Sequence, residues 1–479
     1  MKIKIVGVDD PLTLKELAVI NQGFFPTWEF ALDEADLYFE FNPTASSSKI
    51  SKDHKYIFLK TYLQFLTEKT GKHLPWGLLN SMRPNKLVHS RKKRGATDEV
   101  IIKELQNTYL VQDAKMNLLL NIANHQLKII PDLYNLEQEV SIYIGIPFCP
   151  TRCAYCTFAA YDYEPNKKWI DHFLSALHNE IWMIGRYLIA NKIKVNTIYI
   201  GGGTPTILSA TALRSLLISL VDANRFPQSF REITVEAGRP DTLTSEKLQV
   251  LKDFCVDRIS INPQSFNQTT LSKIGRHHTI TDILEKFTMA KDIGIKNVNM
   301  DLIVGLPNEG KEELAHSLAQ IKDLQPESLT VHMLAYKRKS AISNERQLYT
   351  VVPDDVLTDM AEMTYEFTGN EGYIPYYLYR QKNIAGNMEN IGYAKAGHES
   401  IYNILMMEEA QNVIGLGAGA SSKFLIGESV HNPKDLRTYI ENYETYAKRK
   451  LALLEVSMEI GAMAFTYNPP VAESSSRCI

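Results

Sequence analysis

Three of the five cysteines in this 479-residue chain lie within eight residues of one another. Cys149, Cys153 and Cys156 have the spacing C-x3-C-x2-C and come directly after a predicted strand at 141–146. Such short gaps let one loop wrap its thiolates around a single small inorganic centre. A structural zinc site usually has four ligands, and no fourth Cys or His lies nearby in the sequence. Three thiolates on a four-iron cubane would leave one iron open to a small molecule, as a catalytic site requires.

A glycine-rich turn and an acidic residue follow the next two predicted strands. Gly202, Gly203 and Thr204 stand in "YIGGGTPT", where the missing Cβ atoms let a ligand approach the backbone closely. Glu236 ends the following strand in "TVEAGRP", where its carboxylate could pair with the ammonium group of a ligand. Taken singly, the glycines could form an ordinary turn and the glutamate could be a surface or capping acid.

Three more polar residues continue this pattern. Gln264 lies just beyond the fourth predicted strand, and Arg276 follows it in "KIGRHH". Asp301 lies in the fifth strand among apolar residues, where an acid is costly unless it has a partner such as a ribose hydroxyl. Each of these residues alone could be structural, but together they mark the ends of successive strands in order. The pattern therefore predicts one binding site built from several strands.

The elements that must position these residues alternate between strand and helix. From 141 onward, six short β-rich runs appear, and each of the first five is followed by a helical pattern. This alternation is typical of a parallel sheet wrapped by helices. Six strands between 141 and 335 are too few for a closed eightfold barrel, so we predict an open, partial (β/α)6 barrel. The working groups of such folds lie at the C-terminal ends of the strands.

The regions on either side of the barrel have different patterns. The C-terminal side predicts a helix at 354–370 and a strand at 374–383. We predict four segments, namely an N-terminal α+β accessory domain at 1–138, the barrel at 139–340, a C-terminal α/β extension on the substrate side at 341–455 and a disordered tail at 456–479.

The bulk composition excludes several classes of protein. A net charge of −3 gives no general attraction to nucleic acid or acidic membranes, and we interpret the basic run at 90–95 as a solvated turn. No apolar run reaches the 18 residues of a membrane-spanning helix, and the N-terminus lacks the apolar core of a signal peptide. Few cysteines in an odd number argue against a disulfide framework. We therefore expect a cytoplasmic protein that binds neither nucleic acid nor membrane.

Together these motifs resemble the radical S-adenosylmethionine (SAM) enzymes, and within them the oxygen-independent coproporphyrinogen III dehydrogenases. The resemblance is carried by "YIGIPFC", "GGGTPT", "VEAGRP", "ISINPQSFN", "GRHH" and "DLIVGLP". "SIYIGIPFCPTRCAYCTF" and "YYLYRQKN" are most similar to the HemZ branch of that family. The similarity extends over nearly the whole chain, to about residue 450, and implies the radical SAM fold.

The resemblance also implies two cofactors. Cys149, Cys153 and Cys156 would hold a [4Fe–4S] cluster whose fourth iron chelates SAM, and the reduced cluster would cleave SAM to methionine and a 5′-deoxyadenosyl radical. The residues that match the SAM contacts of the family are Tyr143, Gly202, Gly203, Thr204, Glu236, Gln264, Arg276, Asp301 and Ala335.

The reaction implied by the family is the oxidative decarboxylation of coproporphyrinogen III to protoporphyrinogen IX in haem biosynthesis. It would use a low-potential electron donor such as flavodoxin or ferredoxin. The cations expected near such a tetra-acid substrate are Lys337, Arg338, Lys339, Arg380 and Lys382.

Two departures from the family pattern leave alternatives open. Phe158 stands where the best-studied dehydrogenases have a fourth cysteine, and Gly145 replaces a histidine. Both changes are shared with, or near to, branches of different activity that include haem chaperones. A haem-binding chaperone without decarboxylase activity is therefore one alternative, and a radical SAM methyltransferase is another.

Changing Cys153 to alanine should abolish both the brown absorbance of the cluster and the cleavage of SAM, because it removes one of three ligands. Anaerobic absorption spectra and an assay for 5′-deoxyadenosine test this. Cys255→Ala is the control, because Cys255 lies apart from the motif and should leave both signals intact. A Cys153→Ala protein that kept its cluster would contradict the assignment.

Overall fold

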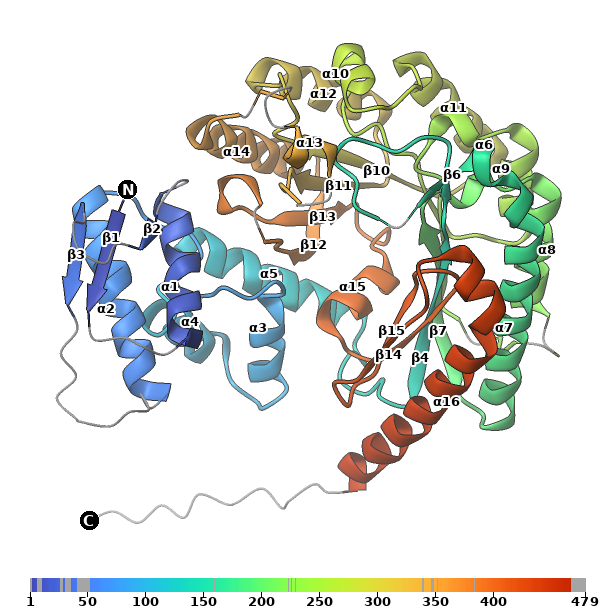
Figure 1. Cartoon of the computed structure of the whole chain (residues 1–479), viewed down its shortest axis with the longest axis horizontal. Coiled ribbons are helices and arrows are strands. Elements are labelled where there is room, and N and C mark those ends of the chain that lie inside the picture. Colours follow the sequence, from blue (N-terminus) through green and yellow to red (C-terminus); the bar gives the residue numbers. More distant parts are fainter. Residues whose placement is uncertain are drawn as a thin grey trace.

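The computed structural model places one large sheet and its helices beside a smaller N-terminal unit (Figure 1). It describes residues 2–6, 11–25, 29–30, 36–40, 52–158, 160–222, 224, 226–228, 230–337, 340–345, 349–350, 352–382 and 384–466. No helix in this part of the chain is long and apolar enough to cross a membrane.

Six parallel strands lie side by side in chain order at the centre of the large sheet. They are β4 (Glu139–Ile146), β7 (Lys194–Gly202), β8 (Glu232–Glu236), β9 (Arg258–Ser260), β10 (Asn297–Val304) and β11 (Ser328–Met333). The longer helices between them are α7 (Ile170–Ala190), α8 (Ala210–Val221), α9 (Ser245–Asp253), α11 (Ile280–Ile293) and α12 (Lys311–Leu324). Parallel neighbours require such crossovers, so the predicted partial (β/α)6 barrel is confirmed.

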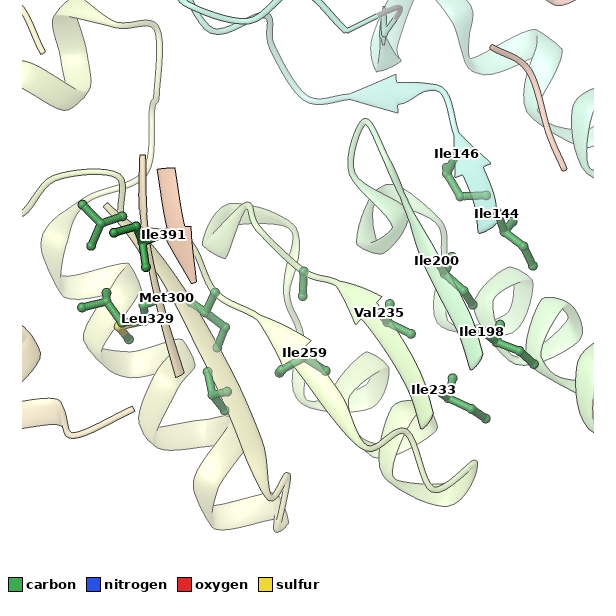
Figure 2. Close-up of a cluster of buried hydrophobic side chains, with 14 of the residues drawn as sticks. Ile144, Ile146, Ile198, Ile200, Ile233, Val235, Ile259, Met300, Leu329 and Ile391 are labelled. Atoms are coloured by element: carbon green, nitrogen blue, oxygen red, sulfur yellow. The ribbon is translucent and has the colours of Figure 1, made fainter. Parts of the chain in front are cut away.

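Side-chain alternation divides the barrel strands into two faces. Ile144, Ile198 and Val235 are fully buried in the main hydrophobic core, which joins the strands to the surrounding helices (Figure 2). Because successive side chains on a strand point to opposite faces, Glu236 and Tyr199 project to the other side, into the barrel interior. The same strands therefore supply both the core and the polar lining of the interior.

The C-terminal extension lengthens the sheet at both edges. Next to β11, β13 (Asn390–Ala394) and β12 (Ile374–Tyr379) add antiparallel strands. Next to β4, β14 (Asn412–Leu416) adds a parallel strand, followed by antiparallel β15 (Ser421–Lys423) and β16 (Ser429–His431). The helices of this region are α13 (Ala341–Asn344), α14 (Asp354–Asn370), α15 (Ile401–Glu408) and most of α16 (Leu436–Thr466), and the short helices elsewhere are α6 (Tyr163–Asn166) and α10 (Gln268–Lys273).

The sequence predicts α14 and β12 but not β14. The reason is the composition of β14, whose apolar run is short and interrupted by glycine. A Cβ atom at Gly415 would lie 2.5 Å from the carbonyl oxygen of Ser421, so the strand needs glycine where the chain doubles back.

The N-terminal unit has its own small sheet. Strands β1 (Lys2–Val6), β2 (Glu29–Phe30) and β3 (Leu37–Glu40) are parallel, in the order β2-β1-β3, and α1 (Pro11–Phe24) and α2 (Lys52–Thr70) belong to the same unit. Its apolar cluster, around Leu17, Phe58 and Tyr62, is separate from the main core. The helices that follow, α3 (Asn85–Lys92), α4 (Asp98–Asn107) and α5 (Asp113–Ile129), share the main core instead.

A buried polar cluster joins this N-terminal region to the C-terminal extension. Trp76 Nε1 donates a hydrogen bond of 2.9 Å to Glu389 Oε2, and Lys115 and Tyr365 both contact the other oxygen of Glu389. The side chain of Glu389 is 2% exposed, so its charge is balanced within the protein by Lys115. These contacts hold the start of β13 against residues that lie more than 250 positions earlier.

Three basic residues of the run at 90–95 form ion pairs with carboxylates. Arg91 donates through Nε and Nη2 to the two oxygens of Glu104, and Lys93 lies 2.7 Å from Glu137 Oε1. Lys92 pairs with Asp98. These three cations are therefore partly neutralised, which weakens the case for a nucleic-acid site.

The end of the chain differs from the predicted disordered tail at 456–479. Helix α16 (Leu436–Thr466) includes the first eleven of these residues, and the remainder lies outside the described part. The helix persists because it packs on α7 and because Ser457 donates a hydrogen bond of 2.7 Å to Asn412 Oδ1.

A fully buried ion pair holds α16 to α7. The side chains of Glu180 and Lys450 are both 0% exposed. Glu180 also accepts hydrogen bonds from Tyr439 at 2.7 Å, from the backbone N–H of Gly417 at 2.9 Å and from Asn432 at 3.0 Å. Removing one partner of such a pair leaves an uncompensated buried charge.

Lys450→Met should therefore destabilise the protein by about 3–5 kcal/mol, measured as a lower midpoint in urea unfolding. Lys448→Met is the matched control, because the side chain of Lys448 is 72% exposed on the same helix, and it should change stability by less than about 0.5 kcal/mol. Equal changes in the free energy of unfolding in the two variants would show that the buried ion pair does not stabilise the protein more than an exposed lysine does.

Candidate active site

One cavity opens at the C-terminal ends of the barrel strands, and it gathers nearly all the predicted site residues. Those that line it are Cys149, Cys153, Cys156, Gly202, Gly203, Thr204, Glu236, Gln264, Arg276, Asp301 and Ala335. Tyr143 is not among the lining residues. Its ring stacks on Tyr199 with centroids 6.1 Å apart, within the barrel interior.

The cysteine loop is tied to the glycine turn by backbone contacts. Two short strands, β5 (Phe148–Cys149) and β6 (Tyr161–Asp162), open and close the loop. The N–H groups of Gly203 and Thr204 donate to the carbonyl oxygens of Ile146 and Phe148 at 2.8 Å. A Cβ atom at Gly203 would lie 2.5 Å from the Phe148 oxygen and 3.0 Å from Cys149 Sγ, so only glycine permits this approach.

The three thiols fit a cluster better than a single ion. They are unpaired, and burial raises the pKa of Cys149 to about 11 despite the hydrogen bond from Thr204 at 3.5 Å. Without a metal the Cys149 thiol is therefore protonated, and a metal centre would displace its proton. Among the described residues, no three Cys, His, Asp or Glu side chains are arranged to hold one metal ion. A cubane carries its ligands on separate irons, so its thiolates can lie further apart.

Glu236 provides a carboxylate at the end of β8. Tyr199 donates a hydrogen bond of 2.6 Å to Glu236 Oε1, and a Cβ atom at Gly201 would lie 2.8 Å from Oε2. Burial raises the pKa of Glu236 to about 7 and nearby Asp301 adds to the rise, while the hydrogen bonds from Tyr199 and Gly202 oppose it. Such a carboxylate would be stabilised in its charged form by a cationic ligand.

Asp301 belongs to a chain of polar side chains that extends from β10 to β12. Asn299 donates to Asp301 Oδ1 at 2.7 Å, and His332 Nε2 lies 3.6 Å from Oδ2. His332 Nδ1 is 3.2 Å from the hydroxyl of Tyr379, which Gln381 contacts at 3.5 Å. Burial opposes ionisation of Asp301, but His332 and Asn299 outweigh it and keep its pKa below the usual value. Asp301 is therefore an ionised hydrogen-bond acceptor.

Arg276 and Gln264 meet at Tyr155. Arg276 donates to the carbonyl oxygens of Gly238 and Asn262 at 2.9 and 2.8 Å, and its Nη2 lies 3.1 Å from the Tyr155 hydroxyl. That hydroxyl donates to Gln264 Oε1 at 3.2 Å. Gln264 has a φ of 67°, an uncommon backbone conformation that is enriched at functional sites.

The cations expected near a tetra-acid substrate have different positions. Lys337 lines the cavity, whereas Lys382 is exposed and is not among the lining residues. Arg380 is buried against Trp76 and donates to the Leu79 carbonyl oxygen at 2.8 Å, so the prediction that it serves a substrate carboxylate is not supported. Arg338 and Lys339 lie outside the described residues.

Sequence reasoning missed His332 and Arg239. His332 lines the cavity from the end of β11, beside Tyr379 from the end of β12, and Arg239 lies against the cysteine loop. The only available signal for His332 and Arg239 was their place at the end of a strand or just beyond it. A histidine or arginine there is just as common in ordinary packing.

The comparison with known proteins decides the family. The model of the radical SAM superfamily matches residues 143–321. The chain is 46% identical to the oxygen-independent coproporphyrinogen-III oxidase-like protein HemZ of Bacillus subtilis (strain 168), over 88% of this chain and 85% of that protein. The chain belongs to the HemZ branch of the radical SAM superfamily.

Other relatives of this radical SAM protein have different names. The haem chaperone HemW of Bacillus subtilis (strain 168) is 32% identical over 63% of this chain and 75% of that protein. The structure of coproporphyrinogen III oxidase (HemN) from Escherichia coli shares the fold, with a TM-score of 0.53 and 22% identity over 67% of this chain and 72% of that chain. The cofactors of this radical SAM protein are a [4Fe–4S] cluster and SAM.

If Glu236 pairs with the ammonium group of SAM, as its motif implies, SAM binding should weaken about tenfold between pH 8 and pH 6, because protonation of Glu236, with a pKa of about 7, removes the negative charge of this pair. Anaerobic equilibrium dialysis with the cluster-loaded protein measures this. Glu236→Gln should bind SAM weakly at pH 8 and lose most of this pH dependence. The exposed Glu246→Gln control should retain it, and an unchanged pH profile in Glu236→Gln would exclude Glu236 as the group responsible.

Proposed function

We propose that this protein is a radical SAM enzyme that oxidatively decarboxylates coproporphyrinogen III to protoporphyrinogen IX in haem biosynthesis. The observation that carries the proposal is the convergence of the cysteine loop, the Glu236 carboxylate and the Asp301 chain on one cavity. The choice of substrate rests on the similarity to the protein named HemZ, which extends over 88% of the chain. The HemW chaperones of Bacillus subtilis and Escherichia coli match 63% and 68% of the chain.

In this proposal the cavity residues hold the two cofactors. Cys149, Cys153 and Cys156 bind three irons of the cluster and leave the fourth for SAM. When bound and reduced by a low-potential donor such as a flavodoxin or ferredoxin, the cluster supplies homolytic cleavage of SAM to methionine and a 5′-deoxyadenosyl radical.

The polar walls would orient SAM. Glu236 accepts from its ammonium group, Asp301 accepts from a ribose hydroxyl, and Arg276 offers a guanidinium to its carboxylate. The backbone of the glycine turn permits close approach, since Gly203 carries no side chain. The remaining SAM contacts that we propose are Tyr143, Gly202, Thr204, Gln264 and Ala335.

The substrate would lie against the wall that carries Lys337, His332 and Tyr379. At each reacting propionate the 5′-deoxyadenosyl radical would take a hydrogen atom from the β-carbon and become 5′-deoxyadenosine. The Cα–carboxylate bond would then break with release of carbon dioxide, one electron would pass to an external one-electron acceptor, and a vinyl group would remain. The ammonium group of Lys337 is suited to hold a propionate carboxylate, and His332 and Tyr379 offer hydrogen bonds. We also place the protein in the cytoplasm, because its described cysteines are all unpaired and a reducing compartment keeps them so.

A haem chaperone is the second candidate, favoured by two observations. Several relatives are named haem chaperones, and Phe158 stands next to the cluster loop where other dehydrogenases have a cysteine. The side chain of Phe158 is large and the residue is 65% exposed, so it could meet a flat haem ring.

One anaerobic assay separates the candidates. Reconstituted protein is mixed with dithionite, SAM and coproporphyrinogen III, and the tetrapyrrole products are identified by mass. Loss of two carbon dioxide units supports the dehydrogenase. Retention of haem by a parallel sample to which haem is added, without turnover of coproporphyrinogen III, supports the chaperone and overturns our proposal, as would a gain of methyl mass.

Lys337→Met should raise KM for coproporphyrinogen III and lower kcat/KM roughly 10–100-fold, because a charge-assisted hydrogen bond contributes about 1.5–3 kcal/mol. Uncoupled SAM cleavage without substrate should remain. Lys382→Met is the matched control, since this exposed lysine does not line the cavity and should leave the kinetics unchanged. Equal kinetics in both variants would remove Lys337 from the substrate site.

A further inference from the structure

A buried arginine outside the predicted site faces one of the cluster thiols. Arg239 follows the end of β8 by three residues and is 3% exposed. Its Nη1 donates to Cys153 Sγ at 3.8 Å and to the carbonyl oxygen of Thr151 at 3.2 Å. Its Nη2 donates to the hydroxyl of Thr151 at 3.0 Å. One guanidinium therefore both holds the cysteine loop and contacts a ligand sulfur.

The charge of Arg239 is not fully neutralised at the sulfur. Its partner Asp241 accepts from Nε and Nη2, both at 3.2 Å, and lies in the short turn Pro240–Thr242. The side chain of Asp241 is 28% exposed, whereas that of Arg239 is 4% exposed. Water therefore screens the carboxylate more than the guanidinium, and a net positive field remains at Cys153. Arg276, also buried, interacts with the same sulfur.

We propose that Arg239 tunes the cluster by raising its reduction potential. One-electron reduction adds a negative charge to the cluster and its thiolates. A buried cation that donates to a ligand sulfur stabilises the reduced state, because hydrogen bonds to sulfur and local charge set the potentials of iron–sulfur clusters. Arg239 would thus ease reduction by a low-potential donor. The inference needs only the cluster and is independent of the tetrapyrrole substrate.

A purely structural role for Arg239 makes a different prediction. If the guanidinium only ties Thr151 to β8, removing it should lower the iron content or the stability of the loop, and the remaining clusters should keep their potential. A tuning role instead shifts the potential of correctly assembled clusters. The two readings are separated by measuring iron per chain and midpoint potential on the same samples.

The experiment is an anaerobic redox titration of the full-length, reconstituted protein, followed by electron paramagnetic resonance, with dithionite as the one-electron reductant. Arg239→Gln should lower the equilibrium constant for reduction at least tenfold, a negative shift of 59 mV. Arg214→Gln is the matched control, because its partly exposed pair with Asp253 lies on α8 and α9, and it should leave the potential unchanged.

Asp241→Asn changes the local charge in the opposite direction. It tests the tuning role even if the Arg239→Gln protein does not hold a cluster. It removes the neutralising carboxylate but retains Arg239, so the potential should shift in the positive direction. Opposite shifts in the two variants support the tuning role. An unchanged potential in Asp241→Asn, or in an iron-replete Arg239→Gln protein, would overturn it.

Discussion

The site depends on how closely the turn after β7 can approach the cysteine loop. At Gly203 the two backbones are so near that a single added carbon would collide with the Phe148 oxygen and crowd Cys149 Sγ. The N–H groups of Gly203 and Thr204 donate across this contact. The position of one thiol is thus set by the absence of one side chain, and whatever the thiol binds is placed against the same turn.

The barrel extends this constraint around the cavity. Isoleucines and valines on one face of each strand fix the sheet against its helices, so the alternate residues must face inward. Tyr199 and Glu236 come together in this way from neighbouring strands, and Asp301 follows from β10. A shift of one residue in the register of any strand would turn its core side chains toward the barrel interior and its interior side chains toward the helices. The register of the strands therefore determines the geometry of the site.

The cysteines and Glu236 could be predicted from sequence because they stand at or just beyond the end of a strongly patterned strand, and Asp301 because it is an acid among apolar residues within one. The partial barrel followed from the same alternation. His332 and Arg239 could not be predicted, since their meaning comes from partners that lie far away in sequence, namely Asp301 and Cys153. The strand β14 was missed because glycine interrupts its apolar run, and the helical start of the supposed tail depends on tertiary packing.

Arg380 shows a different limit. Its position in the sequence suggested a role in binding a substrate carboxylate, but the fold turns its side chain toward Trp76 and the Leu79 carbonyl oxygen. The direction in which a side chain points is decided by the face of its strand and by the residues that pack around it, and a motif shows neither.

The cluster around Glu389 has a consequence for the architecture as a whole. Glu389 precedes Asn390, whose side chain accepts a hydrogen bond from the backbone N–H of Met333, and both Asn390 and Met333 line the cavity. Trp76 and Lys115 complete the shell of this carboxylate from the opposite end of the chain. The N-terminal region is therefore an integral part of the fold. Deleting it would leave the buried Glu389 carboxylate without the positive charge of Lys115, next to residues that line the cavity.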